Sequence, residues 1–455
     1  MFEKCFKLRE NKTDVKTEII AGITTFMTMA YILAVNPNIL SAAGMDPTAV
    51  LLATALSSFI ATMCMAFMAN IPFALSAGMG LNAFFAFTVC GFYGYDWKVA
   101  LLAVFVEGII FIILSLTNVR EAIFNAIPMT LKKGVSVGIG LFIAFIGLQG
   151  AGLCVNNDAT LVGIVNFTEN FNTAGICALL CVIGLLITAV LHVKKVKGSI
   201  LLGILITWIL GMICQACGIY VPDPEGGKYF SLYPHFAMTD FSKLGLTVGQ
   251  CFRADFTNVS IPNFIVIVFS FLFVDIFDTL GTLIGVSTKA DMLDENGRLP
   301  KIKPALLADA IGTTAGALLG TSTITTFVES ASGVAAGGRT GLSAAVTGLL
   351  FLLSMFLAPI FTAIPSFATA PALIMVGFLM FSSITTISFK DEDLTDAIPA
   401  YLAIIAMPLF YSISEGISMG IISYVVLNMV TGKFKKITPL MYVLAVLFIL
   451  KYIFL

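Results

Sequence analysis

The chain has 455 residues, of which 58% are hydrophobic and only 11% are charged, and its mean hydropathy is +1.00. Soluble domains carry about 25% charged residues, so this composition excludes a protein whose whole surface faces water. Because a spanning helix needs about 20 apolar residues, the chain is long enough for more than ten spans. The net charge of −1 excludes the basic footprint of a nucleic-acid-binding protein.

Apolar runs predict seven spans on each side of one long polar stretch. The N-terminal residues 1–16 are polar and basic, and we expect them to lie in the cytoplasm. The first set of spans is expected near residues 17–36, 48–70, 74–90, 99–117, 133–151, 173–192 and 198–218, and the second near 262–285, 304–320, 322–337, 340–358, 367–387, 396–412 and 415–431.

The stretch 219–261 between the two sets is rich in Pro and Gly, which predicts an external loop. After the second set, 432–455 combines a basic segment with a C-terminal apolar helix. The sequence leaves open whether residues 438–455 cross the membrane or lie along its surface.

The distribution of basic residues supports this layout. With the N-terminus inside, most of the 25 Lys and Arg fall on the cytoplasmic side, as the positive-inside rule requires. Seven spans per half is an odd number, so the two halves enter the membrane from opposite sides. We therefore predict an all-α polytopic membrane protein with about fourteen spans in two inverted seven-span repeats, 17–218 and 262–431.

The third span of each half has an irregular start. One begins with the Gly-rich stretch 76–82, and the other begins with the Thr-rich stretch 320–329. Glycine and β-branched residues are poor helix formers, so we expect neither stretch to be regular helix throughout. Interrupted spans at corresponding positions of two halves indicate a binding site near the middle of the membrane.

Carboxylates inside the spans are the strongest chemical signal. Five acids lie well inside the predicted spans, away from their ends, whereas no Lys or Arg does; the acids are Glu107, Asp275, Asp278, Asp309 and Glu329. An acid near the bilayer centre costs up to about 3 kcal/mol on insertion scales. Acids without cationic partners indicate groups that hold protons or bind a ligand rich in N–H donors.

Asp275 and Asp278 lie one turn apart on the predicted eighth span, and Thr279 and Thr282 extend the same polar face. Two carboxylates this close in a low dielectric do not ionise together readily, so we expect one of them to hold a proton. The alternative is a pair that only satisfies hydrogen bonds in the packing.

Glu329 is expected near the N-terminus of a half-helix, where backbone amides favour an anion, and Asn82 takes the equivalent place in the first half. For both residues the alternative is a capping role. The aromatic residues Phe84, Phe85 and Phe327 adjoin the irregular stretches and can stack on a flat ring, or pack in the core.

Glu107 and Asp309 are weaker candidates. We expect Glu107 to tie helices together and Asp309 to lie close to a membrane face. Most of the nine cysteines lie in apolar runs, so we expect neither disulfides nor a metal site, and no motif indicates a cofactor.

Four segments together resemble a known family. The stretches GITTFMTMAYILAVNP (22–37), SAGMGLNAFF (76–85), FVDIFDTLGTL (273–283) and TSTITTFVESASGVAAGGRTG (321–341) are similar to the adenine/guanine/hypoxanthine permease branch of the nucleobase:cation symporter-2 superfamily. The resemblance extends over nearly the whole chain.

The resemblance implies a core domain from 17–117 and 262–358, a gate domain from 118–218 and 359–431, and short extended segments in spans 3 and 10. Asp278 and Glu329 match the substrate-binding acids of the eighth and tenth spans, and Asn82 and Asp275 match polar positions of the purine branch. Thr282 stands where uracil and xanthine relatives often have His.

The function implied is import of purine nucleobases, namely guanine, hypoxanthine or adenine, by proton symport with alternating access at the cell membrane. The expected partners are the purine, the proton and the lipid bilayer, with a homodimer formed through the gate domains. A 6-oxopurine presents ring N–H groups that carboxylates accept. The expected substrate-binding residues are Asp278, Glu329, Asn82, Phe327 and Thr282, and the expected proton-coupling residues are Asp275, Asp278 and Glu329.

Other functions are less compatible with these residues. A transporter of another nucleobase remains open. An anion carrier on the same fold is disfavoured because unpaired carboxylates repel an anion. A membrane-embedded enzyme would need a metal-ligand set or a nucleophile with a base, and neither is present in the sequence.

Overall fold

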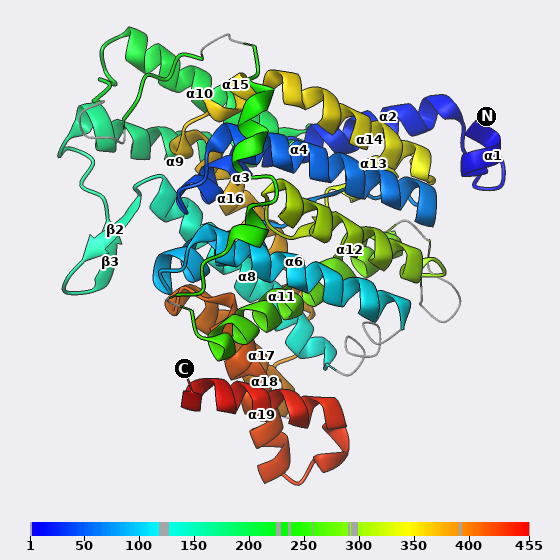
Figure 1. Ribbon diagram of the computed structural model, residues 1–455. Helices are drawn as coiled ribbons and strands as arrows, with labels where there is room; N and C mark the ends of the chain where they lie inside the picture. The colour runs from blue at the N-terminus through cyan, green and yellow to red at the C-terminus, as the bar shows by residue number, and fades with distance from the viewer. Residues whose placement is uncertain are drawn as a thin grey trace.

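The computed structural model describes residues 2–117, 127–223, 229–234, 238–257, 259–289, 292, 299–390 and 394–454 (Figure 1). The helices of the first half are α1 (Phe2–Phe6), α2 (Val15–Met29), α3 (Ile32–Ser41), α4 (Pro47–Cys64), α5 (Met79–Ala83), α6 (Trp97–Leu116), α8 (Met129–Gly150), α9 (Ile176–Val193) and α10 (Ser199–Ala216). The helices of the second half are α11 (Ile261–Lys289), α12 (Ile302–Leu319), α13 (Ser330–Ala335), α14 (Gly341–Ser354), α15 (Ala358–Thr362), α16 (Ser366–Phe381), α17 (Leu394–Leu409), α18 (Ile413–Val430) and α19 (Pro439–Phe454). The strands are β1 (Leu75–Ala77), β2 (Cys154–Asn157), β3 (Leu161–Ile164) and β4 (Ile324–Thr326).

Polar caps set the start of several long apolar helices. Asp14 accepts a hydrogen bond from the Thr17 backbone amide at the start of α2, and Asp46 accepts one from Ala49 at the start of α4. These side chains satisfy amides that the first turn of a helix leaves without partners. The short polar segments between apolar runs therefore locate the helix ends.

The predicted fold class is confirmed, but the count of fourteen spans is not. Among the described residues, ten helical segments have the length and composition to cross a membrane. The predicted third and tenth spans contain the strands β1 and β4 and only short α-helices, and α17 has 16 residues. The apolar part of α11 among the described residues, Ile261–Ile276, is too short to be counted with the ten.

The packing of the helices has a repeated pattern. The pairs α4 with α12 and α8 with α16 each join corresponding spans of the two predicted repeats, and β1 pairs with β4 in the same way. The contact of α2 with α14 has its counterpart in α6 with α11. Such a pattern is expected when two halves are related by a pseudo-two-fold axis.

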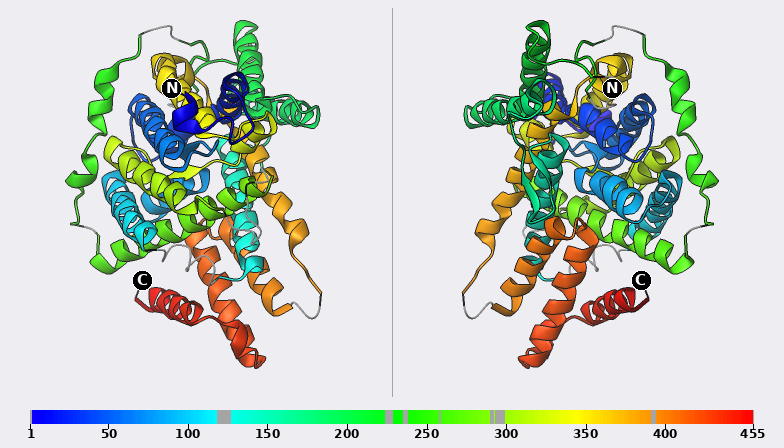
Figure 2. Two further views of the ribbon diagram at one scale, coloured as in Figure 1. Left: turned by 90° about the vertical axis from the view of Figure 1, so that its right-hand side faces the viewer. Right: turned by 90° about the vertical axis from the view of Figure 1, so that its left-hand side faces the viewer.

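Two groups of helices follow from these contacts. In one group, α12 packs against α4 and α6, and α14 packs against α2 and α4. In the other, α8 packs against α16 and α17, and α9 packs against α10 and α16. Figure 2 shows α17 and α18 extending below the first group. Residues 118–126, at the start of the predicted gate part, lie outside the described residues.

Two connections have structure that the sequence analysis did not predict. Between α8 and α9, β2 and β3 form an antiparallel hairpin in which Cys154 pairs with Ile164. Within the predicted external loop, the 3-10 helices η4 (Phe241–Leu246) and η5 (Gln250–Arg253) pack against α4 and α6. Figure 2 shows this segment running along the outside of the first group.

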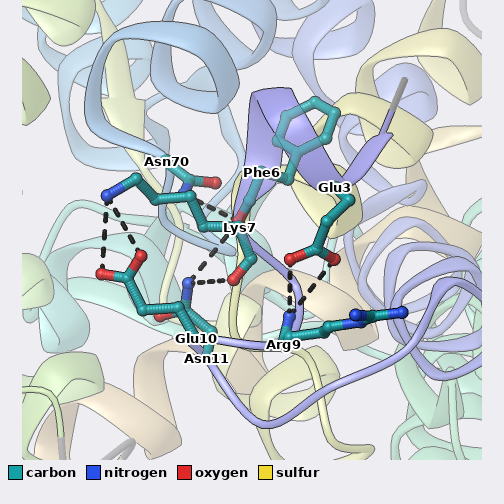
Figure 3. Close-up of polar contacts among 7 residues, drawn as sticks. All are labelled: Glu3, Phe6, Lys7, Arg9, Glu10, Asn11 and Asn70. Atoms are coloured by element: carbon teal, nitrogen blue, oxygen red, sulfur yellow. Dashed lines mark hydrogen bonds and ion pairs between the residues drawn. The ribbon is translucent and has the colours of Figure 1, made fainter.

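The N-terminal segment folds back onto the helices rather than extending away. Phe6 and Leu8 are buried against residues of α14 such as Leu342. Asn70 donates a hydrogen bond to the Phe6 carbonyl (3.0 Å) and accepts one from the Gly341 amide (2.8 Å). Figure 3 shows this contact beside the Glu3 carboxylate, which accepts from the Arg9 amide.

The C-terminal helix α19 packs against α18 and α11. Met441, Leu444 and Phe448 are buried, and the Phe448 ring centroid lies 6.1 Å from those of Phe269 and Phe273. Its 16 residues give a length of about 24 Å, which is shorter than the roughly 30 Å hydrocarbon core.

Candidate functional site

Two short strands meet in the interior of the first group of helices. β1 and β4 are antiparallel, with Ser76 paired to Thr325, and all of their residues are buried. The Gly78 amide donates to the Thr323 carbonyl (3.0 Å) and extends this pairing by one residue. The extended segments predicted for spans 3 and 10 are therefore confirmed, and their backbone groups are satisfied by each other.

A half-helix follows each strand. Gly78 is the N-cap of α5, which continues into the π-helix η2 (Phe84–Phe92), and Glu329 is the N-cap of α13. Both N-caps line one cavity. The two positive helix ends therefore face the same space, and such ends favour carboxylates and polar ligand atoms.

This cavity has a volume of about 830 Å³ and lies between α2, α8, α11 and the segment from β4 to α13. That volume is within the range of small-molecule sites. Its acidic lining residues among the described part of the chain are Asp278 and Glu329. Thr282, Thr325 and Phe327 also line it. Four of the five predicted substrate-binding residues are thereby brought to one cavity.

Glu329 is buried, with 9% of its surface exposed, and the hydroxyl of Tyr31 donates a 2.7 Å hydrogen bond to its Oε1 atom. Tyr31 lies in the break between α2 and α3 and also lines the cavity. Tyr31 was not among the predicted site residues, although it is part of the motif at 22–37. The signal available was a hydroxyl-bearing residue within an apolar run.

Asp278 is partly exposed to the cavity, and Thr325 of β4 lines the same cavity. Its charged neighbours are Glu329 and Asp309. Asp278 on α11 and Glu329 at the start of α13 therefore line the same cavity from two different elements.

Asp275 lies behind the cavity instead of lining it. It is fully buried, and the Thr279 hydroxyl lies 2.7 Å from its Oδ1 atom and 2.9 Å from Oδ1 of Asp309. Asp309 was expected close to a membrane face. It is fully buried because α12 packs between α4 and α6, and its closeness to a membrane face stays a prediction.

Asn82 is also fully buried and does not line the cavity; its side-chain oxygen accepts from the Ser322 hydroxyl. This contact links α5 to the segment before β4. Glu107 accepts a 2.8 Å hydrogen bond from Thr323, so it ties α6 to the same segment. The ring of Phe84 packs against Phe271 at 4.9 Å, which is a core contact.

Basic residues line another part of the same cavity. They come from the start of α8, the last turn of α9 and the turn between α9 and α10, and they are Lys132, Lys133, His192, Lys195 and Lys197. The Lys133 ammonium group donates to the Thr386 carbonyl (3.1 Å). Within the described ranges, no group of three or more His, Cys, Asp or Glu residues is arranged to hold a metal ion.

Comparison with known proteins gives the family. A family model described as the Permease family matches residues 16–419. A putative permease of Methanocaldococcus jannaschii is 49% identical over 453 residues, which cover 100% of this chain and 98% of that protein. The adenine permease AdeP of Escherichia coli is 42% identical over 100% of this chain and 96% of its own length. The guanine/hypoxanthine permease PbuO of Bacillus subtilis is 43% identical, with 98% and 99% covered.

The fold is similar to a solved transporter structure. The transmembrane domain of the cyanobacterial bicarbonate transporter BicA superposes with a TM-score of 0.64, covering 89% of this chain and 97% of that chain, at 15% identity. This likeness concerns the fold alone. From the family match and the relatives, the chain is a multi-pass membrane transporter that belongs to the Permease family, and its resemblance to the adenine/guanine/hypoxanthine branch of the nucleobase:cation symporter-2 superfamily is confirmed.

Proposed function

We propose that the chain imports purine nucleobases by proton symport with alternating access. The observation that carries this proposal is the pair of acids, Asp278 and Glu329, that face one cavity from two different elements. Relatives at 42% and 43% identity are an adenine permease and a guanine/hypoxanthine permease. A neutral, donor-rich base suits a site whose acceptors are carboxylates.

The substrate contacts follow from the chemistry of the lining residues. Glu329, oriented by Tyr31 through one oxygen, accepts from the ring N–H of a 6-oxopurine and also from the exocyclic amine of guanine. Asp278 accepts from a second N–H, and Phe327 and Thr282 contact the ring. Asn82 acts indirectly, because its bond to Ser322 holds the segment that leads into β4.

We propose Asp275, Asp278 and Glu329 as the residues that couple transport to the proton. An acid that gains a proton on one side and loses it on the other links substrate affinity to the proton gradient. The two groups of helices, as core and gate domains, would move relative to each other around the cavity. The basic residues at 132–133 and 195–197 support a cytoplasmic opening and a cytoplasmic N-terminus in the cell membrane. A homodimer through the gate domains is part of the same proposal.

The test is uptake of labelled hypoxanthine, guanine and adenine into vesicles that contain the purified protein. Uptake should require an inward proton gradient and should stop when an ionophore collapses it. Uptake that is indifferent to the ionophore but depends on sodium would contradict the proton coupling but not the substrate class. Competition by bicarbonate or sulfate, without competition by purines, would contradict the substrate class.

A further inference from the structure

We infer that the turn between α17 and α18 closes the end of the cavity opposite its basic residues, and that Tyr411 and Thr88 are the positioning residues of this closure. The outer seal, as we call it, is the contact of Phe87, Thr88, Phe142, Phe145 and Tyr411. A closed end of a substrate cavity must open when the cavity faces the other side of the membrane, so this role rests on the proposed alternating access.

The outer seal joins residues from both groups of helices. The Tyr411 ring lies against Phe142 and Phe145 of α8, with centroid distances of 5.3 and 6.0 Å, and against Phe87 of η2 at 5.9 Å. All three ring pairs are edge-to-face, which is an arrangement that aromatic rings prefer. The fully buried Thr88 hydroxyl donates a 3.0 Å hydrogen bond to the Tyr411 carbonyl. Because η2 packs against α6 of the first group, whereas α8 and α17 belong to the second, the outer seal connects the two groups.

The backbone of Tyr411 has a conformation that tyrosine rarely adopts. Its φ is 54°, in the left-handed region. The Ser412 amide donates to the Met407 carbonyl (3.0 Å), which is the pairing of a helix C-terminus whose left-handed residue is usually glycine. Tyrosine in this position costs free energy that glycine would avoid. Such conformations persist where surrounding contacts hold them, and the ring contacts of the outer seal supply that support.

The course of α8 shows where the outer seal lies relative to the cavity. The residues of α8 that line the cavity begin at its basic end and stop beside the outer seal; they are Lys132, Lys133, Ser136, Ile139 and Ile143. Phe142 and Phe145 lie at this second end. At 1.5 Å per residue, Phe145 is about 20 Å along the helix from Lys132. The cavity therefore lies between the basic residues and the outer seal.

The helix α11 gives the same order. Asp278, Thr282 and Val286 line the cavity. Ser270, about two turns before Asp278, has its hydroxyl 2.8 Å from the Ser414 hydroxyl of α18. This hydrogen bond is a second link to the turn between α17 and α18. The part of α11 on the far side of the cavity from Val286 is thus also joined to that turn.

The wall between the cavity and this turn is closely packed. Gly80 of α5 lines the cavity, and a Cβ atom there would lie 2.9 Å from Ile139 of α8 and 3.4 Å from Ile413. Phe142 is fully buried. The short helix α5 therefore meets α8 and the residues after Tyr411 without room for a methyl group.

This packing gives the outer seal a role in transport. The basic end of the cavity is proposed to face the cytoplasm, so the outer seal faces the outside. Purine from the outside reaches Asp278 and Glu329 only when the two groups of helices separate at the outer seal. Loosening the outer seal should therefore raise the fraction of molecules whose cavity opens to the outside.

The first test measures how fast a membrane-impermeant thiol reagent, added outside right-side-out membrane vesicles, labels the reporter variant Ile143→Cys. Ile143 is buried at the cavity wall beside Phe142. Mass spectrometry of its peptide separates this label from labels on the native cysteines. Labelling should be slow in the reporter chain, about tenfold faster when Tyr411→Gly is added, and several-fold faster with Thr88→Val. Glycine fits the left-handed turn, so the helix end stays intact in Tyr411→Gly.

Two controls separate the outer seal from general loosening. Tyr411→Phe keeps the ring contacts and should be labelled as slowly as the reporter chain. Thr347→Val removes the same kind of bond, because the fully buried Thr347 donates to the Gly22 carbonyl (2.9 Å), but that bond joins α14 to α2 within one group. Labelling in Thr347→Val should be unchanged.

Two labelling results would overturn the inference. One is labelling of Tyr411→Gly as slow as in the reporter chain, and the other is equal acceleration by Thr347→Val and Thr88→Val. If Tyr411→Gly fails to fold, Phe145→Ala removes one ring of the outer seal and should accelerate labelling in its place. Labelling of Phe145→Ala as slow as in the reporter chain would count equally against the outer seal.

The second test is the kinetics of hypoxanthine uptake. A larger outward-open fraction binds external base more readily, so Tyr411→Gly should lower KM for external hypoxanthine, and it should lower kcat because return to the inward-open state is disfavoured. A merely structural defect would reduce the number of active molecules and leave KM in place. Absence of purine uptake while the labelling results hold would contradict the proposed substrate but not the outer seal. Proton-coupled uptake with unchanged KM and unchanged labelling in Tyr411→Gly would contradict the outer seal but not the proposed function.

Discussion

The hydroxyl of Tyr31 donates a 2.7 Å hydrogen bond to Oε1 of Glu329, and the two residues are 298 positions apart in the chain. Tyr31 lies where the first span breaks, between the end of α2 at Met29 and the start of α3 at Ile32. Glu329 lies where the tenth span changes from strand to helix. Two irregular points of the backbone therefore support one oriented carboxylate at the cavity wall.

Replacing Tyr31 with Phe should lower the affinity for hypoxanthine about tenfold. The change keeps the ring and removes the hydroxyl, and a hydrogen bond to a charged group contributes about 1.5–3 kcal/mol, where 1.4 kcal/mol is a factor of ten. The measurement is equilibrium binding of labelled base to purified protein. Tyr95→Phe is the control, because the Tyr95 hydroxyl bonds Asn263 away from the cavity. Equal affinity in Tyr31→Phe and wild type would show that Glu329 does not need this partner.

Replacing Glu329 with Gln should reduce affinity for guanine more than affinity for hypoxanthine. The amide keeps the size of the side chain but turns one acceptor into a donor facing the ring N–H. A buried mismatch of this kind costs about 1–3 kcal/mol. Guanine has the additional exocyclic amine, so it loses more. The measurement is the binding constant of each base in Glu329→Gln and Glu329→Asp. Glu329→Asp is expected to retain more affinity than Glu329→Gln. Equal losses for the two bases would instead assign Glu329 to the helix terminus.

The sequence predicted those parts of the site whose residue types are unusual in a membrane. Burying a carboxyl group in a membrane costs free energy, so acids such as Asp278 and Glu329 are rare there and usually functional. Both of them line the cavity. The Thr-rich stretch before Glu329 is a poor helix, and residues 324–326 form β4. In each case a local property of the sequence, either charge or helix propensity, was sufficient for the prediction.

Other parts of the site depend on how helices pack, which local sequence does not determine. Asp309 follows Lys303 closely, which predicts a place near a membrane face, but its full burial comes from the packing of α12 and was not predicted. Asp275 and Asp278 share a helix face, but the helix is oriented so that only Asp278 reaches the cavity. The only signal for Tyr31 was its hydroxyl within an apolar run, and this signal is weak because an aromatic residue there normally indicates core packing.

Replacing Gly333 with Ala should destabilise the protein. A Cβ atom at Gly333 would lie 2.0 Å from the Thr25 hydroxyl and 2.9 Å from the Ala21 carbonyl, so α13 packs on α2 without room for a methyl group. Overpacking of this kind typically costs about 1–3 kcal/mol. The measurement is the thermal unfolding midpoint in detergent. Gly245→Ala is the control, because no atom lies within 4 Å of that position.

Adding Thr25→Ala to Gly333→Ala should recover part of the lost stability, since it removes the nearer of the two contacts and leaves the Ala21 carbonyl. A Gly333→Ala variant as stable as Gly245→Ala would mean that α13 can move away from α2 without loss. In that case the half-helix that begins at Glu329 would not be held in place by this contact.

The two acids of α11 should have separable roles. Asp278 lines the cavity, whereas Asp275 lies behind it against Thr279. Asp278→Asn should therefore abolish purine binding at equilibrium, because the carboxylate that accepts the base N–H is lost. Asp275→Asn, which mimics a permanently protonated acid, should still bind purine but lose its pH-dependent accumulation. The measurements are purine binding to the purified variants across pH and uptake into vesicles. Loss of binding in Asp275→Asn with binding retained in Asp278→Asn would reverse the roles, and normal accumulation in both variants would remove both acids from the mechanism.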